Sequence, residues 1–319
     1  MSVTLIAVIV ALVVGHLAPA LAASVRHYGW YRDWLRWLGQ RFPEGSFWHG
    51  RWGIAIALVP LLLAVGLFQV ALDEPLFGLG GLAFGIAVLF YAWGPRDLDI
   101  DTDAIANAPD NASRRAAAAH LWPDGDMPAQ LDGAALVGAV FRNALMRWFG
   151  VLFWFLVLGP VGALMYRLVA VSAHGEAAQA LPAENRAGAR WLLSLLDWPV
   201  AQLMSLSLAL VGNFDAVLTA WREAGGASFR LDARFLDAAA RASVKCELAE
   251  EAAELAEDAG LEAGGIDTGE GGLPPAVPAI AALGELPELR DAMSLVWRSL
   301  LVWLPVLAPF VIAGWVSWP

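Results

Sequence analysis

The stretch WFGVLFWFLVLGPVGALMYRLVAV, residues 148–171, decides the fold class of this chain. It contains a single charged residue, Arg167. At about 1.5 Å of rise per residue, a helix of this length covers the roughly 30 Å hydrocarbon core of a bilayer. The stretch therefore predicts a transmembrane helix. The residues Gly159, Pro160 and Gly162 inside it allow a kink and a close approach to neighbouring helices.

The composition of the whole chain agrees with a membrane location. Of the 319 residues, 59% are hydrophobic and only 16% are charged, whereas soluble domains carry about 25% charged residues. The net charge of −11 argues against a nucleic-acid partner, because phosphates require basic patches. The single cysteine, Cys246, excludes an internal disulfide and any zinc or iron–sulfur site built from cysteines.

Further apolar segments predict an all-α, polytopic membrane protein with about six transmembrane helices. The segment at residues 191–211 is the weakest, because Asp197 and Pro199 interrupt it, and a broken or re-entrant helix stays open there. The first segment reads as an uncleaved helix, since no basic residue precedes its apolar run. Besides residues 148–171, the apolar segments cover residues 3–23, 52–72, 75–93, 191–211 and 299–318.

The basic residues predict the orientation of these helices. All of them except Arg167, Arg186 and Arg190 lie in alternate connections, at residues 24–51, 96–147 and 214–298. Cytoplasmic loops of membrane proteins carry the excess of Lys and Arg. The pattern therefore predicts both termini on the outer side of the membrane and residues 148–171 running from the cytoplasm outward.

The cytoplasmic connections have helical patterns of their own. Residues 24–51 mix Trp, Leu and Arg, which is typical of an amphipathic helix at the headgroup surface. The acidic run in residues 247–258 has no basic partner in the sequence pattern, and it is expected to be either a solvated face or a docking site for a basic partner. The expected organisation is residues 1–95 (transmembrane, with the 24–51 connection), 96–147 (cytoplasmic), 148–213 (transmembrane), 214–298 (cytoplasmic, with a flexible acidic linker at about 260–278) and 299–319 (transmembrane).

Four alternating carboxylates follow the third apolar segment. Asp97, Asp99, Asp101 and Asp103 resemble the start of a calcium loop, but Ala104 stands where that loop needs glycine. On a helix these side chains would scatter, so a helix-entry or surface role competes with a metal site. We assign no metal and no cofactor here.

Charged residues within apolar segments are the other candidates for function. Arg167 and Asp197 would both lie toward the outer leaflet, so we expect them to form an intramembrane pair, either for packing or around a polar ligand cavity. The sequence contains no phosphate-binding loop and no HExxH or G-x-S-x-G motif. We therefore expect no catalytic residue.

Three blocks of sequence resemble the AmpE family of inner-membrane proteins. They are GPRDLDID (residues 94–101), FWFLVLGPVGALMYRL (153–168) and LDWPVAQLMSLSLALVGNFDAVLTAW (196–221). The resemblance implies a regulatory or sensory membrane protein linked to β-lactamase induction, antibiotic resistance and cell-wall recycling. Its implied partners are the lipid bilayer and a protein on the cytoplasmic side.

The AmpE family is in turn distantly similar to the cobinamide-phosphate synthases of the CobD/CbiB type. Laid on this chain, the membrane motif of those synthases places its Glu at Arg142, its Asn at Asn143 and its Asp at Met146. An arginine cannot bind a cation in place of a carboxylate, so the resemblance implies that the synthase reaction is lost. The alternative function is an enzyme or transporter with a polar site at the cytoplasmic mouth, formed by Arg142, Asn143, Asp97 and Asp99.

Overall fold

The computed structural model describes residues 7–8, 10, 25–72, 79–94, 97–258 and 286–312, and this part of the chain is helical without any strand. Most of the expected first transmembrane segment (residues 3–23), the acidic linker (260–278) and residues 313–319 lie outside it. The elements are α3 (Gly29–Arg41), η1 (Phe47–His49), α4 (Ile54–Ala71), α5 (Leu79–Ala92), α6 (Leu98–Ala106), α7 (Asn111–Ala118), η3 (Ala119–Leu121), α8 (Gly133–Ala144), η4 (Leu145–Phe149), α9 (Gly150–Ala173), α10 (Gly175–Gln179), α11 (Ala183–Val211), α12 (Phe214–Glu223), α13 (Arg234–Asp258) and α15 (Pro287–Ile312).

Three helical segments are long and apolar enough to cross a membrane, judged by length and composition: Ile54–Ala71, Gly133–Ala173 and Ala183–Val211. The first is α4, whose large side chains Leu63, Leu67 and Val70 are more than half exposed. Such an apolar surface is unfavourable in water but not in lipid, because lipid tails are themselves apolar. The helix α5 is apolar but shorter. The all-α prediction is confirmed for the described residues, and three apolar helices agree with a membrane location, whereas six spans are not confirmed.

The helix α9 reverses its direction at Gly159. This residue has φ 73° and ψ −154°, a conformation that only glycine adopts readily, and Pro160 starts the second arm. Gly150 packs so closely on the ring of Tyr166 that a Cβ atom there would collide with it, and Gly162 packs in the same way on the carbonyl of Trp154. In a straight helix, Gly150 and Tyr166 would lie about 24 Å apart. We call this element the α9 hairpin.

The hairpin corrects the prediction for residues 148–171. These residues do not form one helix that runs from one membrane face to the other, because both ends of the hairpin lie together. The hydroxyl oxygen of Tyr166 lies 3.4 Å from the carbonyl of Leu145, and Nη2 of Arg167 donates to the carbonyl of Arg147 at 3.2 Å. Glycine at the close-packed positions lets the two arms touch along their backbones.

The segment at residues 28–48 meets α10 and the start of α11 at the open end of the α9 hairpin. Arg32 on α3 donates to Glu176 on α10 at 2.8 Å, and Tyr31 bonds to Ser172 at 2.8 Å. At the start of α11, Asn185 donates to the carbonyl of Trp48 at 3.0 Å. The sequence pattern placed residues 24–51 and 172–190 on opposite faces of the membrane, and these contacts contradict that placement.

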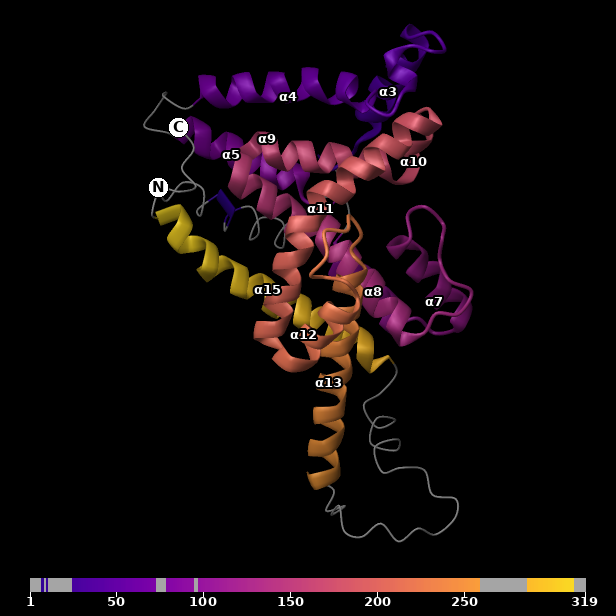
Figure 1. The fold of residues 1–319 in the computed structure, drawn as a ribbon, viewed down its shortest axis with the longest axis vertical. Helices are drawn as coiled ribbons and strands as arrows, with labels where there is room; N and C mark the ends of the chain where they lie inside the picture. Colours follow the sequence, from indigo (N-terminus) through magenta and orange to yellow (C-terminus); the bar gives the residue numbers. More distant parts are fainter. Residues whose placement is uncertain are drawn as a thin grey trace.

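The helix α11 connects the segment around residues 48–53 with the helices α12 and α13. Its first turns lie against residues 48–53, where Gly188 touches the backbone of Arg51, and its last residue is followed by Gly212, which touches Ser243 of α13. In Figure 1, α4, α5 and α9 run side by side across the view, while α11 runs down toward α12 and α13. The expected fifth segment is therefore a longer helix, Ala183–Val211, set across the layer of α4, α5 and α9.

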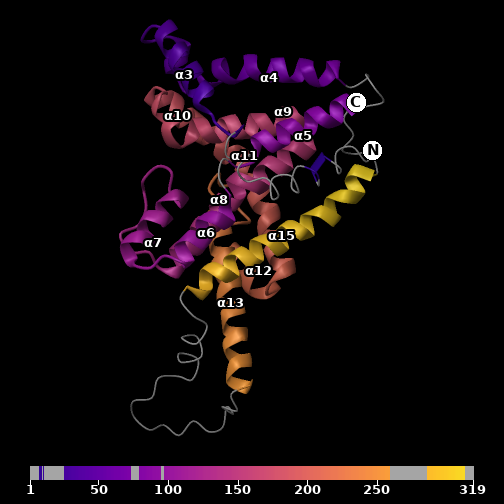
Figure 2. The same ribbon diagram turned by 180° about the vertical axis from the view of Figure 1, so that it is seen from behind.

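The helices α8, α12, α13 and α15 form a second helical unit below this layer (Figure 2). Arg142 of α8 pairs with Asp237 of α13 at 2.5 Å. Two acids of the run in α13, Glu247 and Glu251, pair with Arg298 and Arg290 of α15. The interpretation of this run as entirely without basic partners is thus wrong for these two residues, because its partners come from a distant part of the chain.

The amphipathic pattern predicted in residues 24–51 is present in α3. Tyr31, Leu35 and Leu38 are buried against the protein, while Trp30 and Trp37 are about half exposed. The helix therefore covers the junction between the α9 hairpin and α10 with one face and presents indole rings on the other.

Close packing of the two arms of the α9 hairpin can be tested with alanine. Gly150→Ala and Gly162→Ala should each destabilise the protein by about 1–3 kcal/mol, since a Cβ atom has no room at either position. Gly66→Ala is the matched control, because its Cβ atom would meet Val161 at an ordinary 3.7 Å. Thermal unfolding of the purified protein in detergent measures the difference. Equal melting temperatures for all three variants would contradict the hairpin.

Candidate functional site: two joined cavities at the base of the α9 hairpin

Two arginines bind the carbonyl groups at the C-terminal end of α5. Arg26 donates to the carbonyls of Phe90 and Gly94 at 3.0 and 3.1 Å, and Arg167 donates through Nε to the carbonyl of Ala92 at 2.6 Å. The last carbonyls of a helix have no partner within the helix and carry partial negative charge. The end of α5 thus attracts the two guanidinium groups from α9 and from the segment before α3.

A third arginine, Arg147, lies in the π-helical turn η4 between α8 and the hairpin. It donates through Nη1 to Asp101 of α6 at 2.6 Å and through Nη2 to the carbonyl of His120 at 3.0 Å. The side chain of Asp101 is fully buried and that of Arg147 is 10% exposed. A π turn adds one residue to a helix and is frequent at functional sites. Here it brings Arg147 to the base of the hairpin.

These groups border a cavity of about 330 Å³, which we call the arginine cavity. It opens between α3, the loop after α7, α8 and the second arm of the α9 hairpin. Its polar side chains are those of Tyr28, Arg32, His120, Asn143, Arg147, Arg167, His174 and Glu176.

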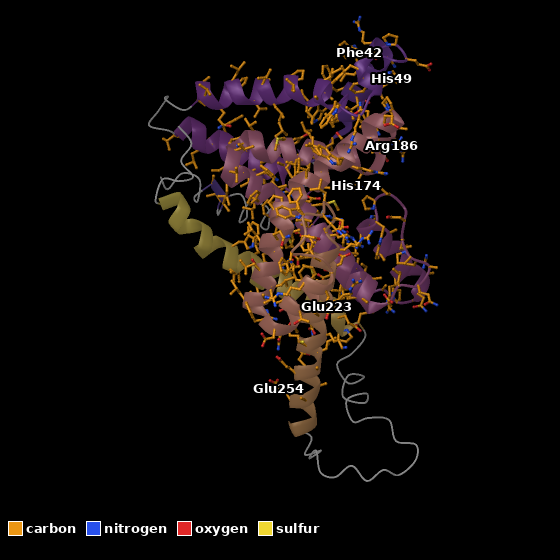
Figure 3. All side chains as sticks on the ribbon, viewed as in Figure 1. Phe42, His49, His174, Arg186, Glu223 and Glu254 are labelled. Carbon is orange, nitrogen blue, oxygen red and sulfur yellow. The ribbon has the colours of Figure 1, made fainter. Side chains whose placement is uncertain are left out.

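A second cavity, of about 470 Å³, adjoins the first, and we call it the aspartate cavity. Four residues line both cavities, namely Pro123, Asn143, Met146 and His174. Figure 3 labels His174 at the junction between the upper layer of helices and the lower unit. The remaining polar side chains of the aspartate cavity are those of Asp124, Asp126, Arg142 and Asp197.

Asp124 organises the loop between the two cavities. Its carboxylate lies 2.7 Å from Nδ1 of His174, accepts the backbone N–H of Gly175 at 3.0 Å and lies 3.4 Å from Arg190. Burial by itself would raise the pKa of Asp124, but these three partners outweigh it and lower the pKa below the ordinary carboxyl value. Asp124 is therefore an ionised anchor for the start of α10.

Two of the residues predicted from the sequence lie at the cavities. Asn143 is 3% exposed, lines both cavities and donates its two amide hydrogens to the carbonyls of Leu121 and Ala139, each at 2.9 Å. Arg142 lines the aspartate cavity and pairs with Asp237. Burial raises the pKa of Asp237 although Arg142 opposes the shift.

The other two residues predicted for this mouth, Asp97 and Asp99, do not border either cavity. Asp97 caps α6 by accepting the N–H of Asp99 at 3.3 Å, and Asp99 accepts the indole N–H of Trp297 at 2.9 Å. On a helix, carboxylates two residues apart point in different directions, so the four acids of this segment separate. Within the described ranges, no group of three His, Cys, Asp or Glu side chains has a geometry that could hold a metal ion.

The predicted pair of Arg167 and Asp197 is not formed. The guanidinium of Arg167 binds backbone carbonyls, whereas Asp197 accepts the hydroxyl of Tyr166 at 2.6 Å. The prediction assumed that both residues lie toward the outer end of straight helices. The reversal at Gly159 instead brings Arg167 back to the base of the hairpin.

Sequence reasoning missed the roles of Asp101 and Arg147. One signal was available for Asp101, since it shares a helical face with the buried residues Leu98 and Ile105 at spacings of three and four. An acid within an apolar face is expected to have a buried partner. Nothing in the sequence identified Arg147 as that partner.

The chain has no match among known family models, curated proteins or solved structures. What it does therefore has to be argued from the site itself. The geometry offers a partly enclosed space with both polar and apolar walls, of a size that suits a small ligand.

The buried pair of Asp101 and Arg147 can be tested by a double-mutant cycle. Asp101→Asn and Arg147→Gln should each destabilise the protein by about 3–5 kcal/mol, because each leaves a buried charge without its partner. The double variant should lose clearly less free energy of unfolding than the two single variants lose together. The exposed Asp103→Asn on the same helix is the control and should change stability by less than about 0.5 kcal/mol. Strict additivity in chemical denaturation would contradict a direct interaction.

Proposed function

We propose that this chain is a non-catalytic regulatory or sensory protein of the bacterial inner membrane, of the AmpE type, linked to β-lactamase induction and cell-wall recycling. We further propose that it reads its signal through a small ligand bound in the two joined cavities. The observation that carries the proposal is the position of these cavities where α8, the second arm of the α9 hairpin, α10 and α11 meet.

The walls of the cavities support a signalling role because they come from both parts of the molecule. Arg167 belongs to the α9 hairpin, Asn143 to α8, and His174 and Asp124 to the loops before α10 and α8. A ligand that binds one arrangement of these elements better than another shifts the population between them. The exposed surfaces of α12 and α13 would then present that change to a protein partner in the cytoplasm.

The alternative of an enzyme or transporter receives less support from the geometry. Its proposed mouth required Asp97 and Asp99 beside Arg142 and Asn143, and the two acids are engaged at α6 and α15 instead. Arg142 is held by Asp237. The cavities therefore retain binding groups but lack the proposed cluster of carboxylates.

The regulatory role is tested in the host bacterium. Deletion of the gene should alter β-lactamase induction after a β-lactam challenge, and the wild-type gene should restore it. The variant Asn143→Leu should fail to restore induction at equal membrane abundance, because it fills the junction of the cavities with an apolar group. The control Asp103→Asn should restore it fully. Unchanged induction in the deletion strain would refute the regulatory role.

We also propose a membrane topology that follows from the hairpin. The segments at residues 24–51, 97–147 and 172–190, which include almost all basic residues of the first two thirds of the chain, lie together on the cytoplasmic side. The α9 hairpin enters the bilayer from that side and returns. The crossing segments are then the N-terminal apolar segment, α4, α5 and the C-terminal part of α15, which leaves both termini in the periplasm.

Single cysteines in a Cys246→Ala background test this topology. Glu44→Cys, Gln179→Cys and Ala249→Cys, all at exposed positions, should react with a membrane-impermeant maleimide only after the inner membrane is opened. Ala71→Cys, at the far end of α4, should react in intact spheroplasts. A straight helix through residues 148–171 predicts instead that Gln179→Cys reacts in intact spheroplasts, and that result would refute the re-entrant hairpin.

A further inference from the structure

Two ionisable side chains beside the α9 hairpin have no oppositely charged partner among the described residues. Arg167 is 3% exposed and binds only the carbonyls of Ala92 and Arg147, and no described carboxylate lies within ion-pair distance of it. Asp197 accepts the hydroxyl of Tyr166, and no described cation lies within ion-pair distance. An ion held away from water is costly unless it is paired. Dipoles compensate part of this cost at both residues.

The two charges line different cavities. Arg167 lines the arginine cavity and Asp197 lines the aspartate cavity. The cavities adjoin each other, and Asn143 and Met146 border both. A molecule that extends past Asn143 could therefore reach both charges at once.

Apart from the exposed Asp126, the other charged groups in the walls are paired. In the arginine cavity, Arg32 pairs with Glu176 and Arg147 pairs with Asp101. In the aspartate cavity, Arg142 pairs with Asp237, and Asp124 is held by His174 and Arg190. Positive charge is left uncompensated at one end, and negative charge at the other end, where the exposed Asp126 adds to it.

We propose that the joined cavities bind a zwitterionic small molecule, an amino acid or short peptide, with its carboxylate at Arg167 and its ammonium group at Asp197. The inference rests on the proposed function, which makes these cavities the ligand site. A guanidinium and a carboxylate form strong charge-assisted hydrogen bonds, and so do an ammonium group and a carboxylate. A simple anion would leave Asp197 unpaired, and a simple cation would leave Arg167 unpaired.

The wall between the two ends suits the middle of such a ligand. Both amide hydrogens of Asn143 are bound to protein carbonyls, so its side-chain oxygen is the atom that it offers to the cavity. That oxygen can accept a peptide N–H. Met146 supplies an adaptable apolar surface for a small side chain. The cavity volumes of about 330 and 470 Å³ accommodate a ligand of one to a few residues.

The experiment uses the full chain in nanodiscs made of phosphatidylglycerol and phosphatidylcholine. A panel of free amino acids and unblocked dipeptides is screened by thermal shift, since a ligand that binds only the folded state raises the melting temperature. Each hit is then compared by calorimetry with its N-acetylated form, its C-terminal amide and phosphoethanolamine. The expected result is at least one zwitterionic hit whose two blocked forms each bind about tenfold or more weakly.

Two variants assign the charges. Asp197→Asn keeps the shape of the side chain and should abolish the preference for the free ammonium group, so that the hit and its N-acetylated form bind alike. Arg167→Lys keeps a positive charge, which protects the fold, and should weaken the hit about tenfold through loss of the planar donor pair. The control Asp103→Asn should bind as the wild type does.

Several outcomes would overturn the inference. They are the absence of any zwitterionic hit, equal binding of hits and blocked forms, and binding of phosphoethanolamine without any amino acid or dipeptide, which would assign the site to a lipid headgroup. Failure of this ligand class with induction still dependent on Asn143 would leave the proposed function intact. Specific zwitterion binding with unchanged induction in the deletion strain would refute only the regulatory role.

Discussion

The contact between Gly150 and the ring of Tyr166 fixes the rest of the architecture, because it closes the α9 hairpin. A chain that reverses within an apolar segment must pair its backbone groups internally, and two short helical arms do so on each side of Gly159. Closing the hairpin returns Arg167 to the level of Arg147 and the end of α5. The positions of α10, of the start of α11 and of both cavities follow from that return.

Electrostatic interactions then fasten the base of the α9 hairpin to α5 and α6. The carbonyls at the end of α5 bind Arg26 and Arg167, and the buried pair of Arg147 and Asp101 ties the π turn to α6. Each of these bonds connects residues far apart in the sequence. Of the charged side chains that line the two cavities, Arg167 and Asp197 are bound by dipoles and not by opposite charges. Because each of them can still bind a group of opposite charge, we interpret the cavities as a binding site.

The sequence predicted the class of the fold and part of the site, and the reason for each failure is physical. The helices α4, α5 and α3 followed from hydrophobicity and from their amphipathic pattern. The hairpin did not, because hydropathy is the same for one long helix and for two half-length arms, and a Gly-Pro step allows both a kink and a reversal. That error also misplaced Arg167 beside Asp197. Asn143 and Arg142 were found through sequence resemblance, whereas the partner of Asp101 depends on packing between distant segments.

The length of the α9 hairpin has a mechanical consequence. Its first arm, from Gly150 to Gly159, is about 14 Å long, close to half the thickness of a hydrocarbon core. The half-exposed side chains near its tip, Val157 and Leu158, would end near the middle of the bilayer. The hairpin would then take up area in one leaflet only and act as a wedge. Its stability would depend on how tightly the lipids of that leaflet are packed, and the cavities at its base would share this sensitivity to lateral pressure.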